Sequence, residues 1–194
     1  MNGETIMGMT RNEAAAALSE IERTAERGQV LRGYQHAGPI LMLWGVIWAT
    51  GYGLMGVLSE ESWGVIWMVL NSLGFLGAVL MHRRAGGGAS AGEAKAGSWR
   101  MGIAIVALTA FFFATFSLFQ ATDPDPYLAF PGLVTGLMYV SMGLWKMPRY
   151  LWIGAVLFAA TLIGFHFFRP WLTFWMAGFG GGGLFLAGLW MRKL

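Results

Sequence analysis

The stretch Gly38–Leu58, GPILMLWGVIWATGYGLMGVL, contains no charged side chain and decides the fold class. A helix needs about 20 predominantly apolar residues to cross the hydrocarbon core of a bilayer. This stretch therefore predicts a membrane-spanning helix, and five further stretches of the same kind follow it. The six expected spans are Gly38–Leu58, Trp63–Met81, Met101–Gln120, Tyr127–Trp145, Tyr150–Phe168 and Trp171–Met191.

The composition of the whole chain agrees with this interpretation. The 194 residues are 56% hydrophobic and only 12% charged, whereas a soluble domain carries about 25% charged residues. No charged residue falls inside the six stretches, and the chain has no cysteine, which excludes a disulfide scaffold and a thiolate metal site. We expect an all-α fold, a polytopic transmembrane helical bundle of six spans arranged as three hairpins.

The distribution of Lys and Arg predicts the orientation, because cytoplasmic segments of membrane proteins carry an excess of both. If the N-terminus is cytoplasmic, 12 of the 13 basic residues lie in segments on that side. Arg169 alone lies on the other side, together with Glu60, Glu61, Asp123 and Asp125. We therefore expect a multi-pass protein of the inner (plasma) membrane with both termini in the cytoplasm. The net charge of +3 follows from this bias, so no nucleic-acid partner is expected.

Two parts of the chain are expected, a cytoplasmic N-terminal segment over 1–33 and a membrane domain over 34–194. A short amphipathic helix is predicted over Thr10–Arg32, with a bend permitted by Gly28 and Gly33 before the first span. A Gly/Ala/Ser-rich cytoplasmic loop is predicted over 82–98. The candidate partner-binding residues share one face of the N-terminal helix, unless that helix merely leans on the bundle or the headgroups; they are Leu18, Ile21 and Ala25.

A second candidate site combines aromatic and polar residues at mid-depth in the spans. Trp44 and Trp48 are four residues apart and therefore share a helix face. The polar groups either form hydrogen bonds between helices or line a pocket for a lipid, a quinone or another hydrophobic compound. The candidate ligand-binding residues are Trp44, Trp48, Tyr52, Asn71 and Tyr139.

Two histidines allow a third interpretation. His36 begins the first span and His82 ends the second, so both are expected at a similar depth near the inner surface. Such a pair could supply the axial ligands of a b-type haem, although both side chains could equally face lipid headgroups. Apart from this interpretation, no cofactor and no metal are expected.

The expected spans contain no charged side chain and no catalytic motif. Charged residues inside a membrane usually mark transport or proton pathways, and their absence argues against an ion-coupled pump. No zinc-protease motif and no serine elbow is present, so an enzyme is not expected. Gly132 and Gly136, and the glycines between Gly178 and Gly183, predict close helix packing; the second group could instead mark a bend or a cavity wall.

The segment Leu31–Trp48, LRGYQHAGPILMLWGVIW, resembles the opening of small bacterial six-span inner-membrane proteins of unassigned function. The resemblance implies a bacterial inner membrane and identifies no functional residue. The expected function is that of a non-enzymatic membrane subunit, sensor or regulator that acts through cytoplasmic protein contacts. A binder or transporter of a hydrophobic small molecule or lipid, and a haem-linked redox subunit, are the alternatives. The expected partners are the lipid bilayer, a membrane or cytoplasmic protein, and a second copy of the chain.

Overall fold

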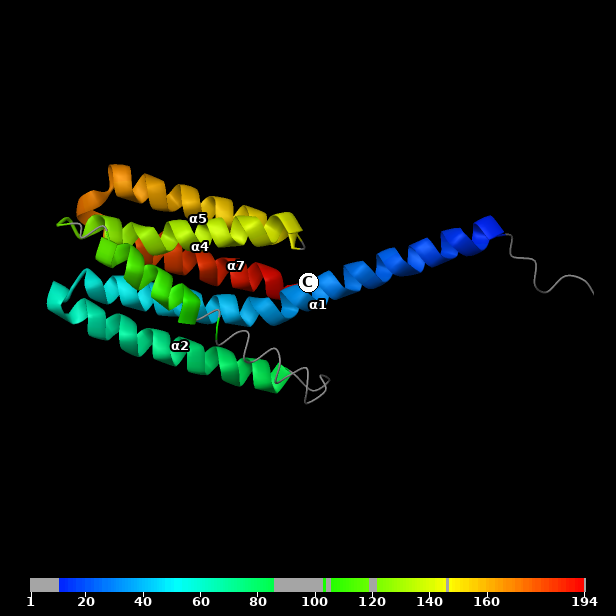
Figure 1. The fold of residues 1–194 in the computed structure, drawn as a ribbon, viewed down its shortest axis with the longest axis horizontal. Coiled ribbons are helices and arrows are strands. Elements are labelled where there is room, and N and C mark those ends of the chain that lie inside the picture. Colours follow the sequence, from blue (N-terminus) through cyan, green and yellow to red (C-terminus); the bar gives the residue numbers. More distant parts are fainter. Residues whose placement is uncertain (1–10, 86–102, 104–105, 119–121, 146, 194) are drawn as a thin grey trace, which may run out of the picture.

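A computed structural model of the chain describes residues 11–85, 103, 106–118, 122–145 and 147–193. These residues form helices and turns, and none of them lies in a β-strand. Figure 1 shows a bundle of roughly parallel helix axes from which one long helix projects. The principal helices are α1 (Arg11–Met55), α2 (Trp63–Ala85), α4 (Asp125–Trp145), α5 (Pro148–Phe167) and α7 (Gly183–Arg192).

Five helical segments are long and apolar enough to cross a membrane. They match the first, second, fourth, fifth and sixth expected spans, and α2, α4 and α5 begin within two residues of the predicted starts. For the third expected span, Met101–Gln120, the structure describes a shorter apolar helix over Val106–Leu118. Most of the loop predicted over 82–98 lies outside the described residues.

The N-terminal helix is not a separate short element. Helix α1 runs without interruption from Arg11 to Met55 over 45 residues, so the break that Gly28 and Gly33 would permit does not occur in this helix. A glycine inside a helix costs only about 1 kcal/mol relative to alanine, and Gly28 meets no neighbouring element that would bend the chain. The boundary expected at residue 33 therefore falls inside one continuous helix.

The last span is assembled from several helical segments. The 3₁₀ turn η2 (Arg169–Trp171) and the short helix α6 (Leu172–Trp175) precede a π-helical segment, η3 (Met176–Gly182), and α7 completes the span. The glycines predicted to pack closely or to bend the helix coincide with the π-helical segment. Its wider turn places Gly180 and Gly181 in the bundle interior, while Gly178 faces open space.

Helix α1 and the last span pack antiparallel through small residues. A Cβ atom added to Gly45 would lie 2.5 Å from the Phe185 nitrogen, and one added to Gly188 would lie 2.6 Å from the Gly38 oxygen. Such distances require backbone to contact backbone, which only glycine permits. Gly38 and Gly188 meet at one end of the bundle. The contact between Gly45 and Phe185 lies one to two helical turns further into the bundle.

Helices α4 and α5 form the other close pair. A Cβ atom added to Gly136 would lie 3.0 Å from the Gly154 oxygen, and Gly132 would meet the side chains of Thr161 and Met176. The packing role predicted for Gly132 and Gly136 is therefore confirmed. Among the helices whose contacts are described, the closest pairs are α4 with α5 and α1 with the last helical segments. The arrangement as three hairpins stays a prediction.

The bundle has two chemically different ends. At one end Arg169 forms ion pairs with Asp123 (3.2 Å) and Asp125 (3.6 Å). At the other end the backbone nitrogen of Arg149 donates a hydrogen bond to the Tyr34 hydroxyl (3.1 Å), and Gly38 packs beside Arg192. Arg149 and Arg192 therefore lie at the opposite end of the helices from Asp123 and Asp125.

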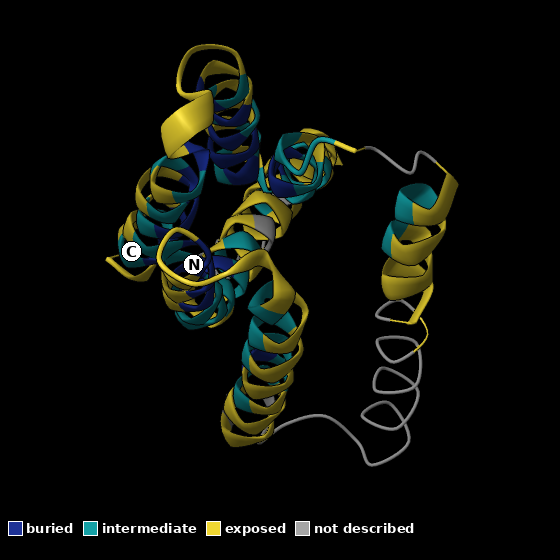
Figure 2. Cartoon of the chain, turned by 90° about the vertical axis from the view of Figure 1, so that its left-hand side faces the viewer, coloured by how far each residue is buried: buried dark blue, intermediate teal, exposed yellow. Residues whose placement is uncertain are grey.

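The outward faces of the helices are exposed (Figure 2), and many of the exposed side chains are apolar. Helix α2 contacts mainly α1 and leaves Val65, Met68 and Leu76 more than half exposed. A soluble protein rarely exposes so large a contiguous apolar surface. The surface is compatible with a protein whose helices face lipid.

Candidate functional site

Two of the predicted ligand-binding residues meet in an aromatic cluster between α1 and α2. The ring centroids of Trp48 and Tyr52 lie 5.7 Å apart, and those of Tyr52 and Trp67 lie 5.2 Å apart, both edge to face. Gly51 makes room for Trp67, because a Cβ atom there would lie 2.9 Å from the Trp67 ring. We call Trp48, Tyr52 and Trp67, together with Met55, the aromatic cluster.

Two polar groups of the aromatic cluster, the Tyr52 hydroxyl and the Trp67 indole N–H, form hydrogen bonds within the protein. The Tyr52 hydroxyl donates to the Leu128 carbonyl on α4 (2.8 Å), and the Trp67 Nε1–H donates to the Met55 sulfur (3.0 Å). Tyr52 is 1% exposed and Trp48 is 8% exposed. The rings fill the space by contacting each other, so a bound compound would first have to separate them. Ligand binding at this place stays a prediction.

The other predicted ligand-binding residues lie around or away from the aromatic cluster. Trp44 packs on Phe75 of α2, with ring centroids 5.2 Å apart. Asn71 is half-buried on α2, one turn beyond Trp67. Tyr139 belongs to a different place, because it packs against Tyr150 of α5 with a centroid distance of 5.1 Å. It lies 11 residues along α4 from Leu128, about 16 Å at the rise of an α-helix.

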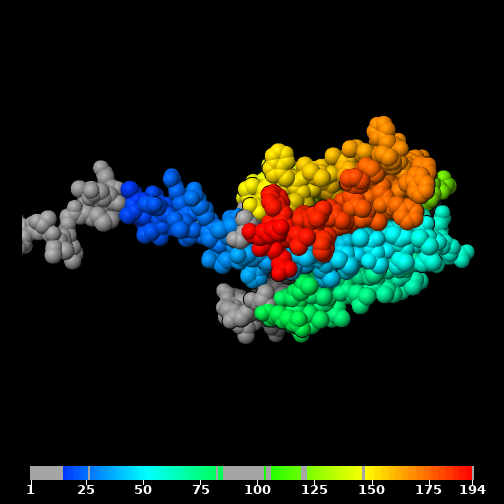
Figure 3. Space-filling model, turned by 180° about the vertical axis from the view of Figure 1, so that it is seen from behind, coloured from blue at the N-terminus to red at the C-terminus, as the bar shows by residue number. Residues whose placement is uncertain are grey.

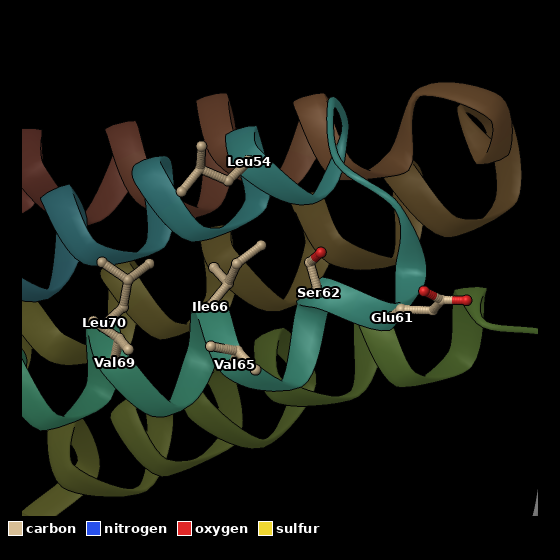
Figure 4. Close-up of a pocket in the computed structure, with 7 residues that line it drawn as sticks. All are labelled: Leu54, Glu61, Ser62, Val65, Ile66, Val69 and Leu70. Atoms are coloured by element: carbon tan, nitrogen blue, oxygen red, sulfur yellow. The ribbon is translucent and has the colours of Figure 1, made fainter.

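An open groove of about 480 Å³ lies on the outside of the hairpin formed by α1 and α2 (Figure 4). It contains none of the predicted ligand-binding residues, and apart from Glu61 and Ser62 its lining is aliphatic. Leu54 comes from α1 and the other six from the 3₁₀ turn η1 (Glu60–Ser62) and from α2. The groove therefore belongs to the apolar outer surface.

The histidine pair proposed for haem is described only in part. His36 is exposed on α1, and its Nδ1 atom lies 2.8 Å from the Arg32 carbonyl oxygen of the preceding turn. The side chain of His82 lies outside the described residues. The haem interpretation stays a prediction.

The predicted partner-binding residues are uncovered. Leu18 is 58% exposed and Ile21 is 65% exposed, and Ala25 is exposed beside them. They lie on the part of α1 that projects beyond the bundle, which we call the arm (Arg11–Arg32); Figures 1 and 3 show it from opposite sides. Packing against the core begins near its end, at Val30.

Sequence reasoning missed two residues. The first is Trp67, which belongs to the aromatic cluster; its sequence signal is its place four residues after Trp63, one helical turn further along α2. Arg149 was counted only toward the charge bias. Its guanidinium carbon lies 4.4 Å from the centroid of the Trp190 ring and 5.4 Å from that of Tyr34. No sequence pattern reveals these contacts, because they join residues from α1, α5 and α7.

The acidic turn before α4 has a structural role. The Asp123 side chain accepts a hydrogen bond from the Asp125 backbone nitrogen (3.0 Å), which is the turn chemistry expected of an Asp-Pro-Asp-Pro sequence. Arg169 pairs with both carboxylates and also lies 4.6 Å from the centroid of the Phe165 ring. Within the described part of the chain, no group of three metal-binding side chains occurs. The ion pairs of Arg169 with Asp123 and Asp125 connect the turn before α4 to the turn after α5.

The chain has no detected relatives. Comparisons with protein-family models, with curated proteins and with solved structures found no match.

Proposed function

We propose that this chain is a multi-pass protein of a bacterial inner membrane, with both termini in the cytoplasm. The five long apolar helices and the separation of acidic and basic residues onto opposite bundle ends support this proposal. The end that holds Arg149 and Arg192 is the basic one, and basic ends face the cytoplasm. The arm projects from that end.

We further propose that the protein is a non-enzymatic membrane subunit, sensor or regulator that binds a protein partner through the arm. The observation that carries this proposal is the continuity of α1 from the arm into the first span. A helix rises about 1.5 Å per residue, so Ile21 lies about 16 Å beyond Arg32 along the same axis. At that distance the apolar face with Leu18 and Ile21 lies beyond the headgroups instead of resting on them.

The chemistry of the arm favours a protein over a lipid surface. Glu20 and Glu22 stand beside Arg23 and Arg27, whereas helices that bind anionic membranes carry a strongly basic polar face. Leu18, Ile21 and Ala25 repeat at spacings of three and four residues, as in amphipathic helices that dock into grooves or pair with other helices.

The test of this proposal is photocrosslinking from the arm in intact membranes. A photoreactive amino acid at Leu18 or Ile21 is expected to give one discrete protein adduct, identified by mass. The same probe at Arg23 is the matched control, because it lies about 200° around the helix from Ile21. The adduct is expected to be lost when Leu18→Ser is combined with a probe at Ile21.

Equal crosslinking from Ile21 and Arg23, or adducts with lipid alone from Ile21, would contradict the proposal. An adduct with twice the mass of the chain would identify a second copy as the partner. Adducts of another discrete mass would identify a different protein, and deletion of 11–32 should then abolish its co-purification.

A further inference from the structure

A second groove, of about 190 Å³, runs between α5 and the last span. Carbon side chains line it almost completely, and Gly183 forms part of its floor. A Cβ atom added to Gly183 would meet nothing within 4 Å, so this glycine is not required for packing inside the chain. Its lining includes Trp152, Val156, Phe179, Gly183, Ala187 and Trp190.

Arg149 lies at the basic end of this groove. Its guanidinium carbon is 4.4 Å from the centroid of the Trp190 ring, which is itself part of the groove wall. The guanidinium also donates to the Trp190 carbonyl (3.4 Å), and the backbone nitrogen of Arg149 donates to the Tyr34 hydroxyl (3.1 Å). These contacts hold the cation at the groove mouth, between two aromatic rings.

No carboxylate neutralises this cation within the described part of the chain, where ion pairs involve Arg169 only. Arg192 and Lys193 add positive charge at the end of α7, close to Trp190. A cation held beside an apolar groove, with the Trp190 ring between them, matches an amphiphile that has an anionic head and an apolar tail.

We propose that the groove between α5 and the last span binds one anionic phospholipid, with an acyl chain along Val156 and Gly183 and the phosphate at Arg149. This inference rests on the membrane insertion proposed above but not on the role of the arm. The bound lipid would join the α4–α5 pair to the α1–α7 pair at the basic end, where Tyr34 and Trp190 already contact Arg149.

Native mass spectrometry of the full chain, gently extracted in detergent, tests this inference. The protein is titrated with phosphatidylglycerol and, separately, with phosphatidylcholine of the same acyl chains. We expect one retained phosphatidylglycerol per chain and weaker retention of phosphatidylcholine. Arg149→Gln should weaken phosphatidylglycerol binding about fivefold, as loss of one basic residue near a lipid surface does, and should weaken phosphatidylcholine binding less, because the choline cation offsets the charge of that lipid's phosphate.

Two matched controls separate a built site from general surface effects. Arg84→Gln removes an exposed cation at the end of α2, away from the groove, and should leave phosphatidylglycerol binding unchanged. Gly183→Leu fills the groove and should weaken the binding of both lipids, whereas Gly178→Leu, a glycine that also faces open space but lies outside the groove, should weaken neither.

Equal losses from Arg149→Gln and Arg84→Gln, or from Gly183→Leu and Gly178→Leu, would overturn the inference, as would equal retention of the two lipids by the unaltered chain. If Arg149→Gln fails to fold, Arg149→Lys keeps the charge and should keep the preference for phosphatidylglycerol. Loss of that preference in a folded Arg149→Lys protein would also overturn it. Because Arg149 lies outside the arm, these results are independent of the crosslinking experiment.

Discussion

Tyr52→Ala is expected to lower the free energy of unfolding by about 3 kcal/mol, the largest effect of any single truncation in the bundle. Tyr52 is 1% exposed and contacts Trp48 on its own helix, Trp67 on α2 and the Leu128 carbonyl on α4. Removing the ring therefore leaves a cavity where three helices meet, and lost packing contacts are the main cost inside a membrane protein. The measurement is reversible unfolding in a detergent titration.

Tyr52→Phe separates the ring from its hydroxyl. This variant keeps the packing and loses one hydrogen bond to a backbone carbonyl, so a loss of about 1 kcal/mol is expected. Phe113→Ala is the control, because Phe113 is 78% exposed on the helix Val106–Leu118 and should change stability by less than about 0.5 kcal/mol. A Tyr52→Ala protein as stable as Phe113→Ala would contradict the described core.

Gly45→Leu is expected to lower the free energy of unfolding by about 2 kcal/mol. A Cβ atom at this position would lie 2.5 Å from the Phe185 nitrogen and 2.8 Å from the Gly181 oxygen. These atoms belong to a backbone and cannot rotate away, so α1 and the last span must separate to admit the side chain. Overpacking of this kind typically costs about 1–3 kcal/mol.

Gly53→Leu is the matched control on the same helix. A Cβ atom added to Gly53 meets nothing within 4 Å, so this substitution should be neutral or should stabilise by up to about 1 kcal/mol through its higher helix propensity. A loss of stability at Gly45, and no loss at Gly53, are therefore expected in the same unfolding assay. Equal effects would show that α1 does not pack on the last span as described.

The long apolar helices could be predicted because their signal is local. A run of apolar residues without charge is enough to predict a membrane helix, and the starts of α2, α4 and α5 lie within two residues of the predictions. The packing of Gly132 and Gly136 was also predictable, because small residues four apart share a face. Both signals can be read within one segment of about 20 residues.

The continuity of α1 and the π-helical segment could not be predicted. Gly28 and Gly33 permit a bend without requiring one, and only the surrounding structure decides. The space beside Gly33, for example, is filled on one side by the Met147 side chain, from the turn between α4 and α5. The π-helical segment over Met176–Gly182 likewise depends on the backbone of α1, against which Gly181 packs at Ala49.

The candidate site was predictable only in part, because contacts between helices depend on their rotation. Trp48 and Tyr52 are four residues apart on one helix, which places them on one face, and their ring centroids lie 5.7 Å apart. Tyr139 is also expected at mid-depth in its span, but its ring packs against Tyr150 of α5 instead. Arg149 acquires its neighbours from two distant helices, and its charge alone gave no indication of them.

Single-cysteine labelling tests the central claim, a multi-pass protein with its arm in the cytoplasm. The chain has no cysteine of its own, so Ser19→Cys on the arm and Ser59→Cys in the turn between α1 and α2 report their positions without background. With a membrane-impermeant maleimide on intact spheroplasts, we predict labelling at residue 59 at once and at residue 19 only after permeabilisation. Labelling of residue 19 in intact spheroplasts, or of both residues only after permeabilisation, would contradict the claim.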